Sequence, residues 1–341
     1  MTNIPVQQTY PMPAADQQLL DNGQGVIDPD VFFEMNTPPT NLSECEQKLE
    51  AFVDYHQKNK SRLVFITSGG TTVPLENQTV RFIDNFSNGH RGACSAEYFL
   101  EAGYAVVFMH RQFSLQPYHR HYTHNASTRF LDYLVPVEND RVEVNPIYSK
   151  KMNQVLRKYQ DATKNNRLLL LDFVTLSDYL FKLKSCTRIL ARLQENAMYY
   201  LAAAVSDFFI PSEKMHEHKI QSGDGALTLT LDQVPKFLTP LVSVWASKGL
   251  IVSFKLETDV NLLVPKARNA LMRYGHQVVV ANMLNTRKQT VTVITKDSEK
   301  VVSITPEEMN NNVEIESRII PQLVHIHNEW IHSDATSTTQ S

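Results

Sequence analysis

The sequence contains little glycine and little cysteine. Only eleven of its 341 residues are glycine, and three are cysteine, Cys45, Cys94 and Cys186. Because the cysteines are odd in number and widely spaced, they indicate neither a disulfide framework nor a zinc site. This pattern is typical of proteins in a reducing compartment, so we expect a cytoplasmic protein.

The sequence also lacks an excess of charge and any long apolar run. Its formal net charge is −3, which gives no reason to expect a nucleic acid partner or a basic membrane-binding surface. No apolar run approaches the roughly 18 residues that span a bilayer, and the first residues, MTNIPVQQTYPMP, do not form a secretory signal. The hydrophobic content of 42% is sufficient for a sizeable core, so we expect a globular protein without membrane association.

The two ends of the chain differ in composition from the rest. Residues 1–28 are rich in Gln, Pro, Asp and Asn, show no hydrophobic period, and are predicted to form a flexible tail. Residues 333–341, which are rich in Ser and Thr, are predicted to form a second tail. We expect one domain over residues 29–332 between them.

Short apolar runs alternate with helical patterns along this domain. Strands are expected over residues 62–67, 104–109, 167–171, 198–204, 250–254 and 277–281, and helices over residues 42–58, 92–102, 151–160, 176–195, 235–246 and 262–274. The pattern predicts an α/β fold with an open, mostly parallel, Rossmann-like sheet and helices on both faces. The runs 290–295 and 300–304 predict an antiparallel hairpin at a sheet edge, where we expect dimerisation.

The first candidate site is the stretch TSGGTTVPLENQTVRFIDNFSNGHRG at residues 67–92, which follows a predicted strand and holds four of the eleven glycines. Glycines there let backbone N–H groups approach an anion, and the following helix N-terminus adds its positive dipole. Neither G-x-G-x-x-G nor GxxxxGK[ST] is present. The glycines alone could equally make turns, but Arg81, Asn85 and Ser87 add groups that bind phosphate or carboxylate.

Other candidates follow later strands, at the sheet edge where ligands bind in open α/β folds. Small residues before Asp207, in Ala202-Ala203-Ala204-Val205-Ser206-Asp207, leave room for a ligand that Asp207 would hold. Asp207 as a helix cap or turn residue is an equal alternative. Phe254 could pack on a base and Asn282 could hydrogen-bond one, although a core Phe and a turn Asn are the commoner roles.

A polar segment over residues 212–225 ends in Gly-Asp-Gly and is typical of a mobile lid. Its Lys219 could close over a phosphate as a point charge. His216 and His218 have no partners at zinc-ligand spacing, so a solvated loop is the simpler interpretation and we assign no metal ligand.

Six motifs occur in a familiar order: SGGTTVPLE, VRFIDNFSNGHRGACSAEYFLEAGY, AAAVSDF, EHKIQS, SFKLETD and VVVAN. Together they resemble phosphopantothenoylcysteine synthetase (phosphopantothenate–cysteine ligase) of the eukaryotic type, from about residue 36 to about residue 330. The resemblance implies a homodimeric ligase that joins 4′-phosphopantothenate to cysteine in coenzyme A synthesis. It also implies Mg²⁺ and a nucleotidylate intermediate formed from ATP, with CTP as the other possible nucleotide.

The resemblance further implies roles for particular residues. The nucleotide would be held by Gly69, Ser87, Gly89 and Gly92 at its phosphates and by Phe254 and Asn282 at its base. Phosphopantothenate would be held by Asn85 at its acyl group, by Ala203, Ala204 and Asp207 along its arm, and by Arg81 of the other subunit at its phosphate. Lys219 matches the lid lysine and is expected to be catalytic with Asn85. The lid has fewer lysines than the bacterial pattern, which favours the ATP-using branch.

Two other functions stay open from the sequence. A nicotinamide-dependent oxidoreductase has a related sheet, but the absent G-x-G-x-x-G argues against it. A catalytically silent scaffold paralogue is the second alternative, although every site residue that the resemblance implies is present.

Overall fold

The computed structural model describes residues 28–123, 128–221 and 226–337. Its main helices are α2 (Pro29–Met35), α3 (Leu42–Lys58), α4 (His90–Glu101), α5 (Pro146–Lys164), α6 (Leu176–Leu190), α8 (Val260–Tyr274), α9 (Pro306–Asn310) and α10 (Glu316–Ser337). The central strands are β1 (Leu63–Ser68), β4 (Ala105–Arg111), β7 (Leu168–Phe173), β8 (Ala197–Leu201), β11 (Leu250–Glu257), β12 (Val278–Met283), β13 (Thr290–Ile294) and β14 (Glu299–Ser303). No helix in the described ranges combines the length and apolar character needed to cross a bilayer.

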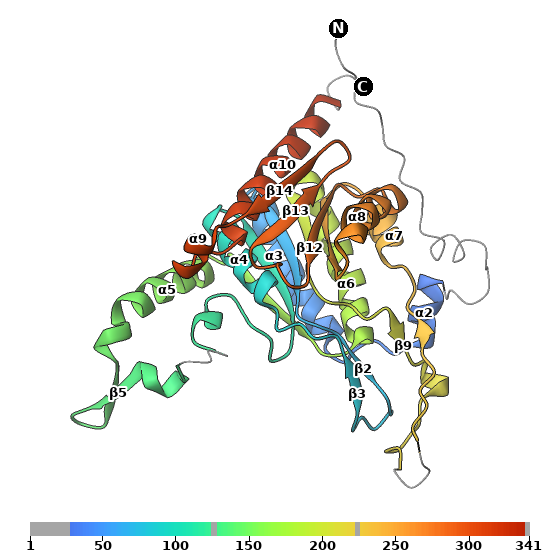
Figure 1. The fold of residues 1–341 in the computed structure, drawn as a ribbon, viewed down its shortest axis with the longest axis horizontal. Coiled ribbons are helices and arrows are strands. Elements are labelled where there is room, and N and C mark those ends of the chain that lie inside the picture. Colours follow the sequence, from blue (N-terminus) through green and yellow to red (C-terminus); the bar gives the residue numbers. More distant parts are fainter. Residues whose placement is uncertain (1–27, 124–127, 222–225, 338–341) are drawn as a thin grey trace.

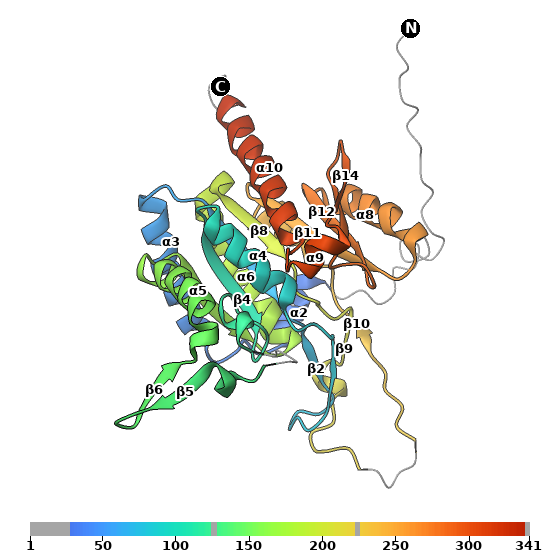
Figure 2. The same cartoon turned by 60° about the vertical axis from the view of Figure 1, so that its left-hand side comes forward.

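These strands form one sheet in the order β14-β13-β12-β11-β8-β1-β4-β7. The six strands from β12 to β7 pair in parallel, and β13 and β14 add an antiparallel hairpin at one edge. The chain runs from β1 outward to β4 and β7, then returns to β8 on the other side of β1 (Figures 1 and 2). The predicted fold and the predicted edge hairpin are confirmed, and the order places a topological switch point between β1 and β8.

Helices cover both faces of the sheet because its central strands are apolar on both sides. Along β1, Leu63 and Phe65 face one core, which α3 and α6 complete. Val64 and Ile66 face the opposite core, which α4 and α10 complete. This alternation explains why the run at 63–66 is continuously apolar and is buried along its whole length.

Three small hairpins lie outside the central sheet. They are β2 (Thr72–Pro74) with β3 (Phe82–Asp84), β5 (Leu134–Val137) with β6 (Arg141–Val144), and β9 (Phe208–Phe209) with β10 (Asp232–Gln233). The β5–β6 hairpin and the arm that carries β9 project from different sides of the sheet (Figures 1 and 2). The β2–β3 hairpin lies beside that arm, because Asn77 N donates to His216 O at 2.9 Å and Gln78 N donates to Glu217 O at 3.1 Å.

The structure corrects three expectations. The helix α10 was not expected, and it runs to Ser337, beyond the predicted start of the C-terminal tail at residue 333. The expected helix over 235–246 is reduced to a short turn, α7 (Leu238–Pro240), followed by a π-helical turn over Leu241–Trp245, since Pro240 lacks the N–H that a regular helix needs. The strand expected over 198–204 ends at Leu201. The predicted tail over residues 1–28 lies, apart from residue 28, outside the described residues.

Candidate functional site

A cavity of about 980 Å³ opens at the carboxyl ends of the central strands. Its walls come from the loop before α4, the segment after β8, the end of β11, Asn282 of β12 and the segment between α9 and α10. This is the switch point between β1 and β8, the place where open α/β sheets bind ligands. The predicted site residues that line it are Asn85, Ser87, Ala203, Ala204, Asp207, Phe254 and Asn282.

The glycines of the loop are required by close packing as well as by backbone geometry. Gly69 and Gly89 have positive φ values of 89° and 81°. At Gly70, an added Cβ would lie 1.7 Å from the carbonyl oxygen of Asn85, and at Gly92 it would lie 2.4 Å from Ser68 Oγ. Gly89 is the N-cap of α4 and offers no side-chain acceptor. The N–H of His90 donates to Asn88 Oδ1 at 3.1 Å, and the next N–H groups of the first turn stay available for an anion.

Backbone hydrogen bonds fasten the loop after β1 to the segment after β8. Ala204 N donates to Gly69 O at 2.8 Å, and Thr71 N donates back to Ala204 O at 3.1 Å. Thr71 also holds the loop before α4, because Asn85 N donates to Thr71 O at 3.2 Å. These hydrogen bonds fix Gly69 and Thr71 of the loop relative to Ala204 and Asn85.

The predicted base-binding residues lie at the neighbouring strand ends. The ring of Phe254 contacts that of Tyr200 edge to face, with centroids 4.9 Å apart. Asn282 Nδ2 donates to Lys255 O at 2.8 Å, and its Oδ1 accepts from Arg91 Nη2 at 3.3 Å. The amide of Asn282 is thus oriented from both sides, and Arg91 connects it to α4.

Cationic side chains that we did not single out from the sequence also line the cavity. They are Arg91, Lys236, Lys255, Arg287 and Lys288. The acidic side chains of the lining, within the described residues, are Asp207, Glu314 and Glu316. Glu316 is paired with Arg91 at 2.7 Å, and Glu314 is paired with Arg120. The remaining cations therefore favour an anionic ligand.

Two features of the sequence could have indicated some of these cationic residues. Lys255 lies in the SFKLETD motif directly after Phe254, and Lys236 follows Val234-Pro235, where a second short element begins after the arm. Lys236 Nζ lies 4.0 Å from Asp207 Oδ1, so it faces the predicted arm-binding carboxylate. The Glu314–Glu316 segment comes from the far end of the chain and gave no local signal.

Arg81 and Lys219 are not brought into this cavity within one chain. Arg81 lies at the end of the connection between β2 and β3, directly before β3, where its Nη1 donates to Glu76 Oε1 at 2.9 Å and to Ile220 O at 3.1 Å. Lys219 is exposed on the arm that carries β9. The two residues are therefore close to each other but separate from the cavity that holds Asn85.

The buried side chain of Glu76 holds the β2–β3 hairpin and the arm that carries β9 together. Its Oε2 accepts hydrogen bonds from the N–H groups of Arg81 at 2.8 Å and Val80 at 3.1 Å, and Ile220 N approaches Oε1 at 3.4 Å. Burial opposes ionisation of the carboxyl, but these hydrogen bonds and the Arg81 guanidinium outweigh it and lower its pKa to about 2. Glu76 is therefore an ionised anchor shared by both arms.

A glycine-rich turn, a free helix N-terminus and a cationic cavity at the switch point of a mostly parallel sheet define an α/β protein with a site for an anionic ligand. Residues 183–320 match the family described as the DNA/pantothenate metabolism flavoprotein C-terminal domain.

Individual relatives cover nearly the whole chain. Phosphopantothenate–cysteine ligase CAB2 of Saccharomyces cerevisiae is 41% identical over 333 residues, covering 91% of this chain and 88% of the yeast chain. The ligase of Mus musculus is 46% identical over 295 residues, covering 86% and 95%. The solved structure of a Cab2 mutant in complex with phosphopantothenate-cysteine has a TM-score of 0.83 and 42% identity, and the match covers 90% of this chain and 99% of that chain. The chain belongs to the phosphopantothenate–cysteine ligase family, as the six motifs indicated.

Proposed function

We propose that this protein joins 4′-phosphopantothenate to L-cysteine and consumes ATP to AMP and pyrophosphate through an acyl-adenylate. The observation that carries the proposal is the cavity at the switch point. Its lining includes Asn85, the first residues of α4, Phe254, Asn282 and several cationic side chains. An adenylate-forming site needs these groups, since it must bind a base, a polyphosphate and a carboxylate together.

In the first step the substrate carboxylate attacks the α-phosphorus and pyrophosphate leaves. Negative charge grows on the phosphoryl oxygens, and the free N–H groups at the start of α4 are placed to stabilise it. The side-chain amide of Asn85 is a neutral hydrogen-bonder that can orient the carboxylate first and the mixed anhydride afterwards. In the second step the cysteine amine attacks the acyl carbon and AMP leaves.

Mg²⁺ is proposed to accompany the nucleotide. Among the carboxylates that line the cavity in the described residues, Glu314 and Glu316 are already ion-paired, which leaves Asp207 with only a long contact to Lys236. Mg²⁺ commonly binds through substrate phosphates, water and one or two protein carboxylates, and Asp207 would supply one such carboxylate. Bound in this way, the ion neutralises phosphate charge.

We further propose a homodimer with shared sites, in which Arg81 serves the phosphate of phosphopantothenate bound to the other subunit. The position of Arg81 outside the cavity of its own chain supports this arrangement. The side chain of Phe86, next to Asn85, is 94% exposed, and aromatic side chains are enriched in protein interfaces.

The direct test mixes the pure protein with phosphopantothenate, cysteine and Mg²⁺, and adds ATP or CTP. We expect pyrophosphate and phosphopantothenoylcysteine in equal amounts, with a higher kcat/KM for ATP. Absence of both products with both nucleotides would contradict the proposed ligase activity and favour a silent paralogue. A melting temperature raised by NADH but not by ATP would instead support the oxidoreductase alternative.

A further inference from the structure

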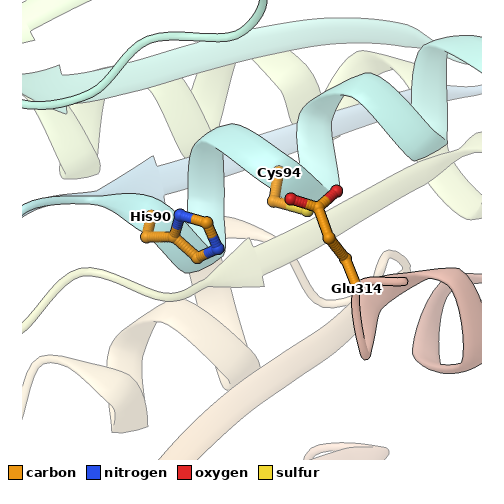
Figure 3. A group of neighbouring side chains, drawn as sticks. All are labelled: His90, Cys94 and Glu314. Carbon is orange, nitrogen blue, oxygen red and sulfur yellow. The ribbon is translucent and has the colours of Figure 1, made fainter. Parts of the chain in front are cut away.

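Three potential metal ligands meet beside the cavity, in a cluster that the proposed ligase reaction does not use. His90 and Cys94 lie one turn apart on α4, and Glu314 lies in the segment before α10 (Figure 3). One ligand atom from each side chain lies within 4.8 Å of those from the other two. The sequence spacing gave no sign of this cluster, because Glu314 is 220 residues from Cys94.

We propose that His90, Cys94 and Glu314 form a three-ligand site for a transition-metal dication, with Zn²⁺ as the best fit. Imidazole and thiolate together select Zn²⁺ over Mg²⁺, which prefers oxygen ligands alone. The site is therefore distinct from the Mg²⁺ that would accompany a nucleotide, and it does not depend on the proposed ligase activity.

The geometry is close to that of a bound ion. Zn²⁺ lies about 2.0–2.3 Å from such ligand atoms, which places the atoms of a tetrahedral site roughly 3.3–3.6 Å apart. Cys94 Sγ already lies 3.0 Å from Glu314 Oε2. The His90 ring has no hydrogen bond among the described residues, and its ligand nitrogen lies within 4.8 Å of the other two ligand atoms, so no existing hydrogen bond opposes its approach to an ion.

The forms in which these side chains bind Zn²⁺ are neutral imidazole, thiolate and carboxylate. Cys94 Sγ donates to Glu314 Oε2 at 3.0 Å, so one proton lies between these two ligand atoms. A bound dication replaces that proton: the S–H bond breaks, an S–metal bond forms, and one proton leaves to solvent.

Neighbouring charges support the ligands without filling the site. Arg120 donates to both oxygens of Glu314 and is also held by Glu97, with Nε 2.7 Å from Glu97 Oε1 and Nη2 2.9 Å from Oε2. Two carboxylates thus share one guanidinium, and Arg120 orients Glu314 as outer partners of metal ligands do.

Exposure indicates where the fourth coordination position lies. Cys94 is fully buried, whereas His90 and Glu314 line the cavity. An ion held by all three ligands would therefore be open on the cavity side, where water can complete the coordination. Three protein ligands and one open position are the usual arrangement of a reactive rather than a closed structural zinc site.

Co²⁺ is a suitable probe, because thiolate ligation gives it a charge-transfer band in the near ultraviolet. The full-length protein, freed of metal by a chelator and kept without substrates, is titrated with Co²⁺ and then with Zn²⁺. We expect one Co²⁺ per chain with this band, displacement by Zn²⁺, and release of about one proton per ion. A protein without the band, or with no proton release, would overturn the proposal.

Three variants make the assignment specific. Cys94→Ser should abolish the band while circular dichroism shows an intact fold, because Ser nearly matches Cys in size. His90→Gln, at a partly exposed position, should weaken Zn²⁺ binding by at least about 10-fold, the lower bound seen for loss of a mere outer partner. Cys45→Ser is the matched control and should keep the band. A band that survives in Cys94→Ser, or that disappears in Cys45→Ser, would reject the three-ligand site. Unchanged Zn²⁺ affinity in His90→Gln would reject it as well.

Discussion

The guanidinium of Arg91 connects α4 to Asn282 on β12, with Nη2 3.3 Å from Asn282 Oδ1. Its Nη1 donates to Glu316 Oε1 at 2.7 Å, and Nη2 also donates to the carbonyl of Arg287. One side chain thus joins the glycine loop, the predicted base-binding amide and the start of α10. The planar guanidinium, with its five N–H donors, is well suited to bind three acceptors at once.

Replacement of Arg91 by alanine should lower the free energy of unfolding by about 3 kcal/mol, because the carboxylate of Glu316 would stay buried without its partner. The double variant Arg91→Ala/Glu316→Gln should recover part of that loss, since it removes the orphaned charge. Urea unfolding of the wild type, Arg91→Ala, Glu316→Gln and the double variant gives the coupling free energy. Strictly additive losses would show that the pair does not act as a unit.

Asn85→Asp should reduce product formation by roughly 100-fold or more while leaving the melting temperature near that of the wild type. The added negative charge would repel the substrate carboxylate that the amide is proposed to orient. The assay measures phosphopantothenoylcysteine under saturating ATP. Wild-type rates in this variant would remove Asn85 from the proposed acyl site.

Lys219→Ala should slow the pyrophosphate burst by roughly 100-fold and change nucleotide affinity much less, because a lysine that meets developing charge acts mainly in the transition state. Lys214→Ala is the matched control on the same arm, where Lys214 is paired with Asp232 at 2.8 Å. Rapid-quench measurements with labelled ATP separate the two effects. An unchanged burst with a raised KM would make Lys219 a binding residue only.

Arg81→Ala and Asn85→Asp should each be nearly inactive alone but complement each other in mixed dimers. A mixed dimer collects both defects in one site and leaves the other site intact. After random exchange about half of the dimers are mixed, so roughly a quarter of wild-type activity should return.

Sedimentation and mass spectrometry of differently tagged chains verify that exchange has occurred in this experiment. Complete exchange without recovered activity would show that Arg81 serves its own subunit. A protein that sediments as a monomer at assay concentrations would contradict the shared-site proposal more directly.

The buried His327 should make the fold less stable in mild acid. Its ring contacts Tyr104 Oη and Glu195 O at 2.8 Å each, and burial lowers its pKa to about 4. Because the folded-state pKa lies below the unfolded value of about 6.5, its contribution is fully present above pH 6.5 and is lost as the pH falls toward 4. The loss between pH 7 and pH 5 should be about 2 kcal/mol.

Chemical unfolding of the wild type and of His327→Gln at both pH values tests this effect. The variant should be less stable at pH 7 but should lose less on acidification. His325→Gln is the control, because His325 lies on the same helix and its side chain is 73% exposed. An equal pH dependence in His327→Gln and the wild type would show that His327 is not the group responsible.

The strands β1, β4 and β12 could be predicted because each is a short, largely apolar run buried on both faces. Local pattern could not reveal α10, in which Pro321 and several histidines interrupt the apolar stripe that packs against β1 and α4. The helix predicted over 235–246 was wrong for the opposite reason. Its apolar residues fit a helix, but Pro235 and Pro240 prevent a regular hydrogen-bond ladder.

Part of the cavity lining could be predicted where residues follow strands, since the carboxyl ends of parallel strands meet at one edge of the sheet. Asp207, Phe254 and Asn282 were found in this way, and all three line the cavity. Glu314 could not be found, because no rule of spacing connects it to a helix more than 200 residues earlier. Its position depends on how the chain after the edge hairpin folds back over α4.

The carboxylate of Glu76 binds both the β2–β3 hairpin and the arm that carries β9. Arg81 and Ile220 bind the same buried group, although about 140 residues separate them in sequence. Movement of the arm that carries Lys219 would break the contact of Ile220 N with this buried, ionised group, which is costly unless another donor replaces it. We therefore expect the β2–β3 hairpin and the arm that carries β9 to move together, so that a ligand contacting Lys219 would also shift Arg81.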